Sequence, residues 1–387
     1  MQPAVPTIRQ LSSTIHLWTG LALSGIVILL SVTGSVLVFK DTIDAWMRPD
    51  LYEVESAGEQ SVGRAVHAIP NVADGESPWL IELSGHRDTP VVVWMGQGEE
   101  HVFVDPYRQT VLGRRAPDAG FVNTLFDLHA ELMAGRTGGI IVGVSGLLLV
   151  LVSLTGLVLW WPRRLRALRA ALVVVWKKGW KRLNYDLHRA GGFYTLGFVL
   201  LTATTGAALI FYTSTQELTN TATGSPAWPP APPTVDTPVS FSPTAIDAAL
   251  DSARSALPGA TASFVYAPAA PEAPLTVRLQ APGEWHPNGR SFVHIASDGS
   301  VLRVDDARSA PVGSRIMHAT YPLHIGAVGG PVVRWLYVLL GLAPAVLSIT
   351  GTIIWYRRWK RTVPDQGGDS APDAEAPVPV RAARLPE

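Results

Sequence analysis

The chain has 387 residues, of which 47% are hydrophobic and 16% are charged, and its formal net charge is zero. Soluble domains carry about 25% charged residues, so this composition argues against a conventional soluble enzyme. The balanced charge provides no overall attraction to nucleic acid. Because the sequence contains no cysteine, disulfides, thiolate metal sites, cysteine-ligated iron–sulfur clusters and covalent c-type haem are excluded.

Four apolar runs are long enough to cross a bilayer, which needs about 20 helical residues. None of them contains Asp, Glu or Lys between its ends, and several of the 13 Trp lie where the runs end, as is typical of a membrane interface. The runs are Leu17–Phe39, Gly139–Trp161, Gly192–Tyr212 and Val332–Tyr356. The sequence therefore predicts a membrane α-helical bundle of four transmembrane helices.

The segment between the second and third runs is strongly basic, with Asp186 as its only acidic residue. By the positive-inside rule this segment is cytoplasmic, as is the basic stretch that follows the fourth run. Both termini are then cytoplasmic, and the two long segments between the runs lie outside. In a bacterium this places the protein in the inner (cytoplasmic) membrane, with the outer segments in the periplasm or at the cell exterior. The basic residues between the runs are Arg163, Arg164, Arg166, Arg169, Lys177, Lys178, Lys181, Arg182 and Arg189.

We also have expectations for the structure of two of the predicted cytoplasmic segments. Leu165–Trp180 combines Arg and Lys with Leu, Val and Trp, and it is either a short helix on the membrane surface or a basic connector. Residues 362–387 are rich in Pro, Ala, Asp and Glu, and we expect a disordered tail there.

The first and third runs align without a gap. His16 and His188 are each followed 18 residues later by the Gly of a Thr–Gly pair, at Gly34 and Gly206. The second and fourth runs align in the same way. His129 and His324 each precede the Gly of a Thr–Gly pair by 27 residues. These coincidences indicate two tandem halves related by a pseudo-twofold axis along the membrane normal.

The repeat predicts one histidine pair at each side of the membrane: His16 with His188 at the cytoplasmic side, and His129 with His324 at the outer side. Two imidazoles from opposite helices suit the two axial positions of a b-type haem. Gly20 and Gly192 lie one turn after the first two histidines and leave room for a flat macrocycle.

Other interpretations of these residues stay open. Zinc needs four ligands, or three and a water, and each side offers only two matched histidines. A histidine at a membrane end is often a plain interfacial residue. His318 is a rival outer ligand, although it aligns with Asn123 rather than with a histidine. For the Thr–Gly pairs, the pattern favours close helix packing by small residues.

Each outer segment has the pattern of one helix followed by four short strands, which predicts two small α+β modules. The first has a helix at Ser61–Ile69 and strands at Trp79–Leu83, Pro90–Met95, His101–Asp105 and Thr110–Gly113. The second has a helix at Ser242–Leu257 and strands at Ala262–Tyr266, Leu275–Leu279, Ser291–Ile295 and Ser300–Val304. The remaining histidines do not have metal-ligand spacing, and of these His286 is a weak candidate for a ligand contact; they are His67, His86, His101, His286 and His294.

These patterns divide the chain into consecutive segments of alternating character. They are 1–40, the N-terminus and first transmembrane helix; 41–122, the first outer module; 123–162, the second transmembrane helix; 163–187, the basic cytoplasmic loop; 188–214, the third transmembrane helix; 215–317, a linker and the second outer module; 318–361, the fourth transmembrane helix; and 362–387, the tail.

Several motifs resemble the PepSY-associated transmembrane family over about residues 8–361. They are the outer stretch from Val102 to Gly113 (VFVDPYRQTVLG), the sequence HLWTG that starts at His16, and the sequence LHIG around His324. Members of this family include iron-regulated membrane proteins and ferric-siderophore reductases. The sequence departs from the family pattern at Gln109, where a Gly is common in the strand turn.

The resemblance implies two periplasmic PepSY-like modules and a haem-b-binding inner-membrane protein that passes electrons to a ferric siderophore. By matching motifs, His16, His188, His129 and His324 become the axial ligands of two haems. Nothing resembles a flavin or nicotinamide domain, so the electron donor, a quinol or a cytoplasmic reductase, is a separate partner. The alternative function is a non-enzymatic PepSY membrane scaffold or regulator that binds a peptide or protease. A transporter is disfavoured because the spans lack intramembrane charges.

Overall fold

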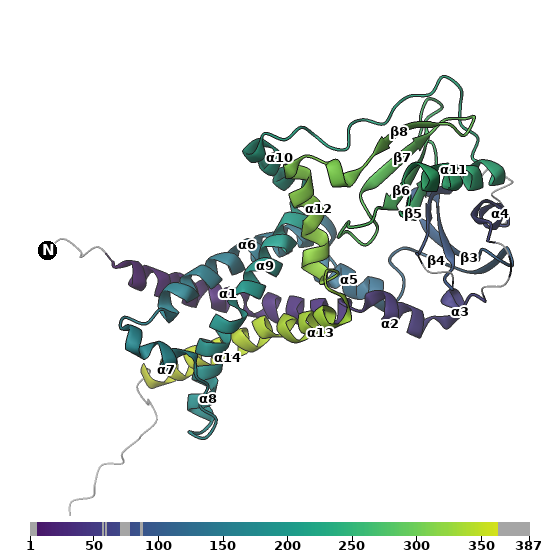
Figure 1. Ribbon diagram of the computed structural model, residues 1–387. Coiled ribbons are helices and arrows are strands. Elements are labelled where there is room, and N and C mark those ends of the chain that lie inside the picture. The colour runs from purple at the N-terminus through teal and green to yellow at the C-terminus, as the bar shows by residue number, and fades with distance from the viewer. Residues whose placement is uncertain (1–5, 56–57, 59, 70–77, 86–87, 363–387) are drawn as a thin grey trace, which may run out of the picture.

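The structure is a computed structural model that describes residues 6–55, 58, 60–69, 78–85 and 88–362. The molecule is elongated, with a helical bundle at one end and a β-sheet domain at the other (Figure 1). The predicted disordered tail lies outside the described residues from position 363 onward, and so does His86.

Four helical stretches are long and apolar enough to cross a membrane: Ile8–Leu37, Gly135–Trp160, Trp180–Ile210 and Gly330–Arg361. The first two are α1 and α6. The third joins α8 (Trp180–Asp186), the π-helical turn η3 (Leu187–Gly191) and α9 (Gly192–Ile210), and the fourth joins α13 (Gly330–Gly341) and α14 (Ala343–Thr362). The prediction of four membrane-spanning helices is confirmed as regards their length and apolar composition.

Helix α1 begins nine residues before the predicted start of the first span. Thr7 and Gln10 form a capping box in which each side chain bonds the other residue's backbone N–H, and this fixes the helix start. His16 therefore lies two turns inside the helix rather than at its end. Within the bundle, α6 packs against both α1 and α9, and α14 packs against α1.

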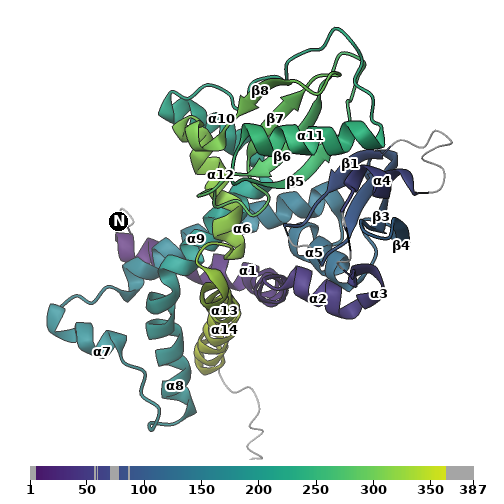
Figure 2. The same cartoon turned by 45° about the vertical axis from the view of Figure 1, so that its right-hand side comes forward.

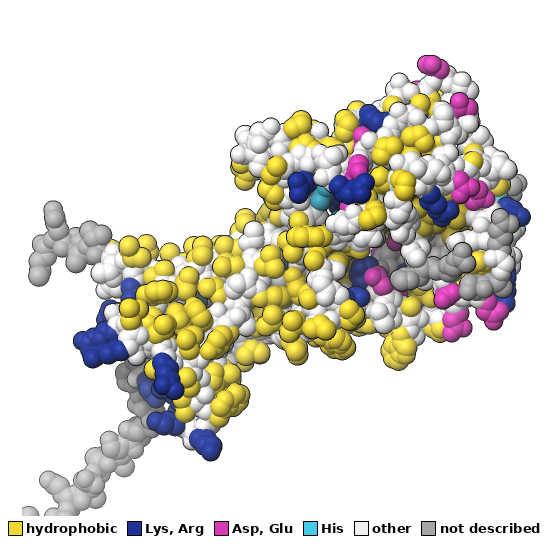
Figure 3. Space-filling view, in the orientation of Figure 1, with side chains coloured by type: hydrophobic (Ala, Val, Ile, Leu, Met, Phe, Trp, Pro, Cys, Tyr) yellow, Lys and Arg dark blue, Asp and Glu magenta, His cyan; other side chains and the backbone are white. Residues whose placement is uncertain are grey.

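Apolar and basic side chains are segregated along the molecule. Figure 3 shows hydrophobic side chains over the bundle, while Lys and Arg gather at the end farthest from the sheet domain. That end carries the η2 turn (Leu165–Ala167) and α7 (Leu168–Leu172). The helix proposed over Leu165–Trp180 is thus shorter than predicted, because the β-branched run Val173–Val175 follows it and Gly179 has a positive φ of 78°.

The sheet domain contains both predicted helix–strand modules. The first is α4 (Val62–His67) with β1 (Pro78–Glu82), β2 (Val91–Met95), β3 (Glu100–Asp105) and β4 (Thr110–Arg115). The second is α11 (Pro243–Ala256) with β5 (Thr261–Tyr266), β6 (Leu275–Gln280), β7 (Ser291–Ile295) and β8 (Val301–Asp305). The predicted strands and helices agree with these bounds to within about two residues.

The two modules share one antiparallel sheet of eight strands in the order β4-β3-β2-β1-β5-β6-β7-β8. The sequence predicts separate modules, and the joining contact is the pairing of β1 with β5, in which Ile81 lies opposite Val265. This pairing satisfies the backbone groups of two edge strands that would otherwise stay open. Helices α4 and α11 lie side by side on one face (Figure 2), where Asp247 accepts hydrogen bonds from the Ser61 hydroxyl and the Gly63 N–H.

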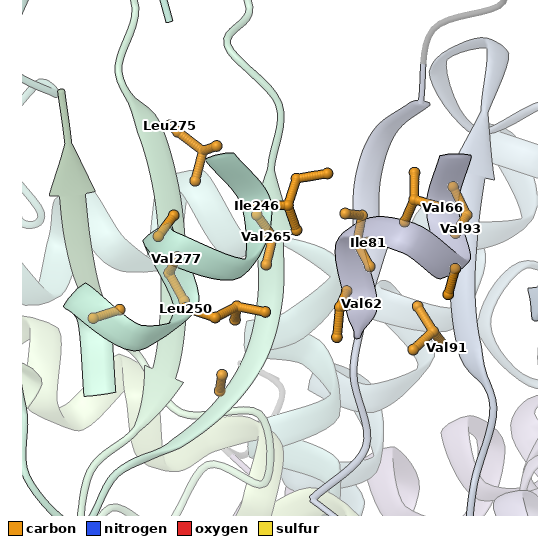
Figure 4. Close-up of a cluster of buried hydrophobic side chains, with 14 of the residues drawn as sticks. Val62, Val66, Ile81, Val91, Val93, Ile246, Leu250, Val265, Leu275 and Val277 are labelled. Carbon is orange, nitrogen blue, oxygen red and sulfur yellow. The ribbon is translucent and has the colours of Figure 1, made fainter. Parts of the chain in front are cut away.

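A single apolar core lies between this face and the two helices. Val62 and Val66 of α4, Ile246 and Leu250 of α11, and the inward residues of the inner strands meet there (Figure 4). The connecting segments form further helices, of which α3 packs against β4 on the opposite face of the sheet. These are α2 (Lys40–Met47), α3 (Pro49–Tyr52), α5 (Phe121–Glu131), α10 (Tyr212–Thr223) and α12 (Val312–Ile325). On this face Asp44, which is buried, accepts hydrogen bonds from Tyr52 and Arg115.

Gln109, at which the sequence departs from the family pattern, lies in the turn between β3 and β4. Its φ is 56°, in the left-handed region, where Gly carries no steric cost. The Asp105 carboxylate accepts hydrogen bonds from the N–H groups of Tyr107 and Arg108 and holds the turn closed. The chain therefore places a strained side chain at a position where Gly would carry no strain.

We predict that Gln109→Gly leaves the sheet domain as stable or stabilises it by up to about 1 kcal/mol, whereas Gln109→Val destabilises it by about 1–2 kcal/mol. Thermal unfolding of the detergent-purified variants measures this difference. Equal midpoints for the Gly and Val variants would contradict a left-handed turn.

Candidate functional site: two histidine pairs across the bundle

The four histidines singled out by the repeat lie in two pairs. His16 of α1 faces His188 of η3, with ring centres 6.1 Å apart and planes inclined at 78°. His129 of α5 faces His324 of α12, with ring centres 6.3 Å apart and planes inclined at 50°. We call the first the far pair, because it lies toward the end of the bundle away from the sheet, and the second the sheet-side pair.

The ring separations match a shared metal between two imidazoles. Two metal–nitrogen bonds of about 2.0–2.1 Å, each with a ring centre about 1.1 Å behind its nitrogen, place the ring centres about 6.3 Å apart. Both observed distances agree with this value. The two pairs therefore have the spacing that axial ligation of one iron requires.

Backbone carbonyls determine which ring nitrogen is free. Nδ1 of His16 lies 3.0 Å from the Val152 carbonyl, and Nδ1 of His188 lies 3.0 Å from the Leu347 carbonyl. Nδ1 of His324 lies 3.1 Å from the Thr202 carbonyl. A carbonyl can only accept, so each Nδ1 carries the proton and donates it. The lone pair of each Nε2 is then available to a metal.

The threonine of each Thr–Gly pair is a second partner for these rings. Thr33 Oγ1 lies 2.9 Å from Nδ1 of His129, Thr350 Oγ1 lies 3.1 Å from Nδ1 of His188, and Thr205 Oγ1 lies 3.1 Å from Nδ1 of His324. Each hydroxyl donates its proton to a carbonyl one turn earlier in its own helix, as Thr33 does to Leu29. Its oxygen therefore accepts from the imidazole, which fixes the same tautomer again.

The glycine of each pair makes room for the ring itself. A Cβ at Gly34 would lie 2.8 Å from Cε1 of His129, and one at Gly206 would lie 2.8 Å from Cε1 of His324. Gly351 stands against His188 and Gly156 against His16 in the same way, at 2.8 and 3.0 Å. The sequence favours helix packing as the role of these pairs, and the structure shows instead that each one seats a histidine. Their constant spacing from the histidines was the signal that could have identified them.

These contacts lie within each half of the chain and repeat from one half to the other. Within the first half, His16 belongs to α1 and is hydrogen-bonded by α6, and His129 is hydrogen-bonded by α1. Within the second half, His188 belongs to η3 and is hydrogen-bonded by α14, and His324 is hydrogen-bonded by α9. Each ring is thus held inside its own half and faces a ring of the other half. Along α1, His16 and Gly34 are 18 residues apart, so the two pairs are about 27 Å apart along the helix.

Several glycines of the first and third spans stand in open space. A Cβ at Gly20 or Gly25 of α1, or at Gly197 of α9, would meet nothing within 4 Å, and one at Gly192 would meet only a Leu347 methyl at 3.7 Å. Glycine inside a helix costs about 1 kcal/mol relative to alanine, and close helix packing does not account for these four. Of these, Gly20 and Gly192 lie one turn after His16 and His188, and they leave a smooth surface beside these histidines that a flat macrocycle fits.

The far pair has two further features. His188 lies in a π-helical turn, a distortion that frequently occurs at functional sites. Within the described part of the chain, Trp160 Nε1 and Asn184 Oδ1 are buried without a hydrogen-bond partner. Trp160 lies one turn after Gly156 and stacks on Phe193, with ring centres 3.8 Å apart. Unsatisfied polar atoms at this place fit a ligand with both donors and acceptors.

The rival ligand His318 lies elsewhere. It packs against Trp228, with ring centres 5.0 Å apart, and does not face His129. His286 stacks on Tyr321 of α12 at 5.2 Å, so this loop histidine reaches the bundle side of the sheet. His67 bonds the Phe241 carbonyl, His101 packs on Trp94, and His294 bonds Asp305. None of these described side chains takes part in either pair.

The fold is thus that of a membrane protein with four membrane-type helical stretches and an antiparallel sheet domain, in which two histidine pairs lie between the two halves of the chain. The family model described as PepSY-associated TM region matches residues 13–358. The chain therefore belongs to this family. No curated protein sequence matches it.

We predict that Gly34→Ala lowers the free energy of unfolding by about 1–3 kcal/mol, because the added methyl group overlaps the His129 ring. The control is Gly139→Ala in α6, whose Cβ would meet only the Ala130 carbonyl at 3.8 Å; this variant keeps or gains stability. Thermal unfolding in detergent compares the two. Equal stability of both variants would show that Gly34 does not seat the ring.

Proposed function

We propose that the protein binds two b-type haems, one at each histidine pair, and carries electrons across the bacterial inner membrane to a ferric siderophore or similar ferric chelate. The observation that carries the proposal is the ring separation at both pairs, together with four Nε2 atoms left free by their Nδ1 hydrogen bonds. Family membership is consistent with the resemblance seen in the sequence.

The donor set favours haem over a bare metal ion. Zinc sites use four ligands, or three and a water. Within the described ranges, no group of three or more His, Asp or Glu side chains comes together as a metal site. Two axial imidazoles complete the coordination of a haem iron, because the macrocycle supplies the other four ligands.

The chain's own residues position and tune each site. Hydrogen bonds from Nδ1 to a carbonyl and to a threonine hold the ring orientation and raise the basicity of Nε2. When bound, haem supplies reversible one-electron chemistry. Axial ligand identity, hydrogen bonding and burial are the features by which a protein sets the reduction potential, and here the same three features are repeated at both pairs.

The charge distribution supports a direction for the electrons. Lys and Arg gather at the far end of the bundle (Figure 3), which the positive-inside rule places in the cytoplasm together with both termini. A separate donor, a quinol or a cytoplasmic reductase, then delivers electrons at the far pair. The sheet domain with its two PepSY-like modules lies in the periplasm or outside the cell, and electrons leave at the sheet-side pair.

The terminal step is balanced by one electron for each iron. Ferric iron in the chelate accepts one electron and becomes ferrous iron, and no atoms are transferred. Siderophore oxygen ligands prefer iron(III), so reduction weakens the chelate and releases the metal. The sheet domain lies against the helix that carries His324, because His286 stacks on Tyr321 of α12. A chelate at this junction is next to the sheet-side pair.

We predict about two b-type haems per chain in detergent-purified protein from cells supplied with haem. A reduced-minus-oxidised spectrum and quantification of haem per chain measure this. One haem would show that one histidine pair is not a site. None would remove the redox proposal and favour the non-enzymatic scaffold that binds a peptide or protease.

A second prediction assigns the ligands. His188→Ala loses the haem of the far pair and keeps the other, because Ala removes one axial nitrogen while the sheet-side pair is untouched. The matched control is His318→Ala, which keeps both haems since this ring faces Trp228. Retention of two low-spin haems in His188→Ala would contradict axial ligation by this residue.

A further inference from the structure

A cluster of cationic and aromatic side chains lies at the junction of the sheet domain and α12. Arg278 of β6, His286 and Arg290 of the β6–β7 loop, and His318 and Tyr321 of α12 form this junction cluster. In Figure 3 a histidine and several Lys or Arg side chains gather where α12 meets the sheet domain. The functional site described above uses none of these residues.

Arg278 is held rigidly within the cluster. Its guanidinium donates to the Gly289 carbonyl through Nε at 3.0 Å and Nη2 at 2.6 Å. It also packs between two aromatic rings, 5.3 Å from the Phe264 centre and 6.0 Å from the Phe292 centre. The residue is only 9% exposed. A positive charge is thus fixed in place on the bundle side of the sheet.

Both histidines of the cluster are uncharged near neutral pH. Burial, together with repulsion from Arg290 and Arg278, lowers the pKa of His286 to about 3 and that of His318 to about 4. Nδ1 of His286 accepts a hydrogen bond from the Asn288 N–H at 3.2 Å. Its Nε2 therefore carries the proton and is a donor. Two guanidinium groups and a neutral imidazole N–H meet at one place.

Among the described residues, neither Arg278 nor Arg290 forms an ion pair with a carboxylate. The ion pairs of this module involve other arginines. Arg290 Nε is buried without a hydrogen-bond partner. The nearby Glu284 carboxylate accepts from the backbone N–H groups of Ala281 and Arg290 and from the Ser291 hydroxyl. By contrast, Arg303 of β8 pairs with Asp305 at 2.9 Å. The Glu284 charge acts on Arg290 without forming an ion pair with its guanidinium. A buried positive charge that lacks a direct ion pair is costly, and an anionic ligand would offset that cost.

The cluster is adjacent to the sheet-side pair. Tyr321 lies one helical turn before His324 in α12, and His286 stacks on it. The same β6–β7 loop borders a cavity of 380 Å³ that is lined by Gln280, Glu284, Trp285 and Pro287 and by residues of the α12–α13 connection. Trp285 is 57% exposed. The cavity and the cluster therefore share the β6–β7 loop, and the loop side chain at Trp285 is open to the surface.

We propose that the junction cluster binds the anionic oxygen atoms of a negatively charged ferric chelate, with Arg290 as the principal contact. The inference rests on the proposed function and specifies its substrate class: chelates with a net negative charge are selected over neutral ones. Charge-assisted hydrogen bonds to guanidinium are about twice as strong as neutral ones. We therefore expect the cluster to bind a negatively charged chelate with higher affinity than a neutral one.

Gallium(III) chelates test the binding without any redox reaction. The probes are gallium–EDTA, which is anionic, and gallium tris-acetohydroxamate, which is neutral, titrated calorimetrically into the detergent-purified full chain. Arg290→Gln removes the charge and keeps a similar shape. The control is Arg254→Gln in α11, an arginine of the same module on the opposite face of the sheet, with a side chain that is 53% exposed.

We expect Arg290→Gln to raise the Kd of gallium–EDTA by about tenfold or more, because a charged hydrogen bond is lost. Arg254→Gln should not change it, and the Kd of the neutral chelate should be the same in all three proteins. Absence of gallium–EDTA binding to the unmodified protein, or an equal Kd in Arg290→Gln, would overturn the proposal. So would a loss of haem in Arg290→Gln with unchanged gallium binding, since the cluster would then serve the carboxylates of the cofactor.

Failure of the proposed function has a different signature. If gallium–EDTA binds through Arg290 but iron(III)–EDTA does not reoxidise the dithionite-reduced protein, the anion site stands and the reductase proposal falls.

Discussion

The hydrogen bond from a histidine Nδ1 to a carbonyl of the neighbouring helix is the interaction on which the rest of the bundle depends. It turns a flexible polar side chain into a fixed one and leaves Nε2 free. It also requires the neighbouring backbone to come close, which explains the glycine opposite each ring. Threonine precedes each glycine because its hydroxyl bonds its own helix and still accepts from the imidazole. Histidine, threonine and glycine therefore form one local arrangement, which occurs four times in the bundle.

Duplication of this unit produces the cross-bundle pairs. A half of the chain holds two rings, one near each end, but it does not face them toward each other. Only when the second half packs against α1 and α6 do His16 and His188, and His129 and His324, approach within 6.1 and 6.3 Å. The pseudo-twofold arrangement thus makes each site dependent on both halves. A site between helices of different halves is a common location for cofactors in membrane bundles.

Much of the structure could be predicted from the sequence, because hydropathy and periodicity are local signals. The four spans, the strands of both modules and the partners within each histidine pair follow from residue spacing alone. The role of the Thr–Gly pairs did not follow, because small residues in a span have the same pattern whether they face a helix or a ring. The pairing of β1 with β5 was missed, since it joins strands that are distant in the chain. Arg278 and Arg290 carry no motif, and only the fold brings them to His286 and Tyr321.

The β1–β5 pairing also has a consequence for biosynthesis. Strand β1 ends at Glu82 and β5 begins at Thr261, and two membrane spans are made between them. At a synthesis rate of about 5–20 residues per second, the edge of β1 waits roughly 10–40 s for its partner. During this interval the first module has an open edge strand, with its hydrogen-bonding groups exposed to other chains. Pairing of β1 with β5 therefore depends on the second and third spans having brought the second module to the same side of the membrane as the first.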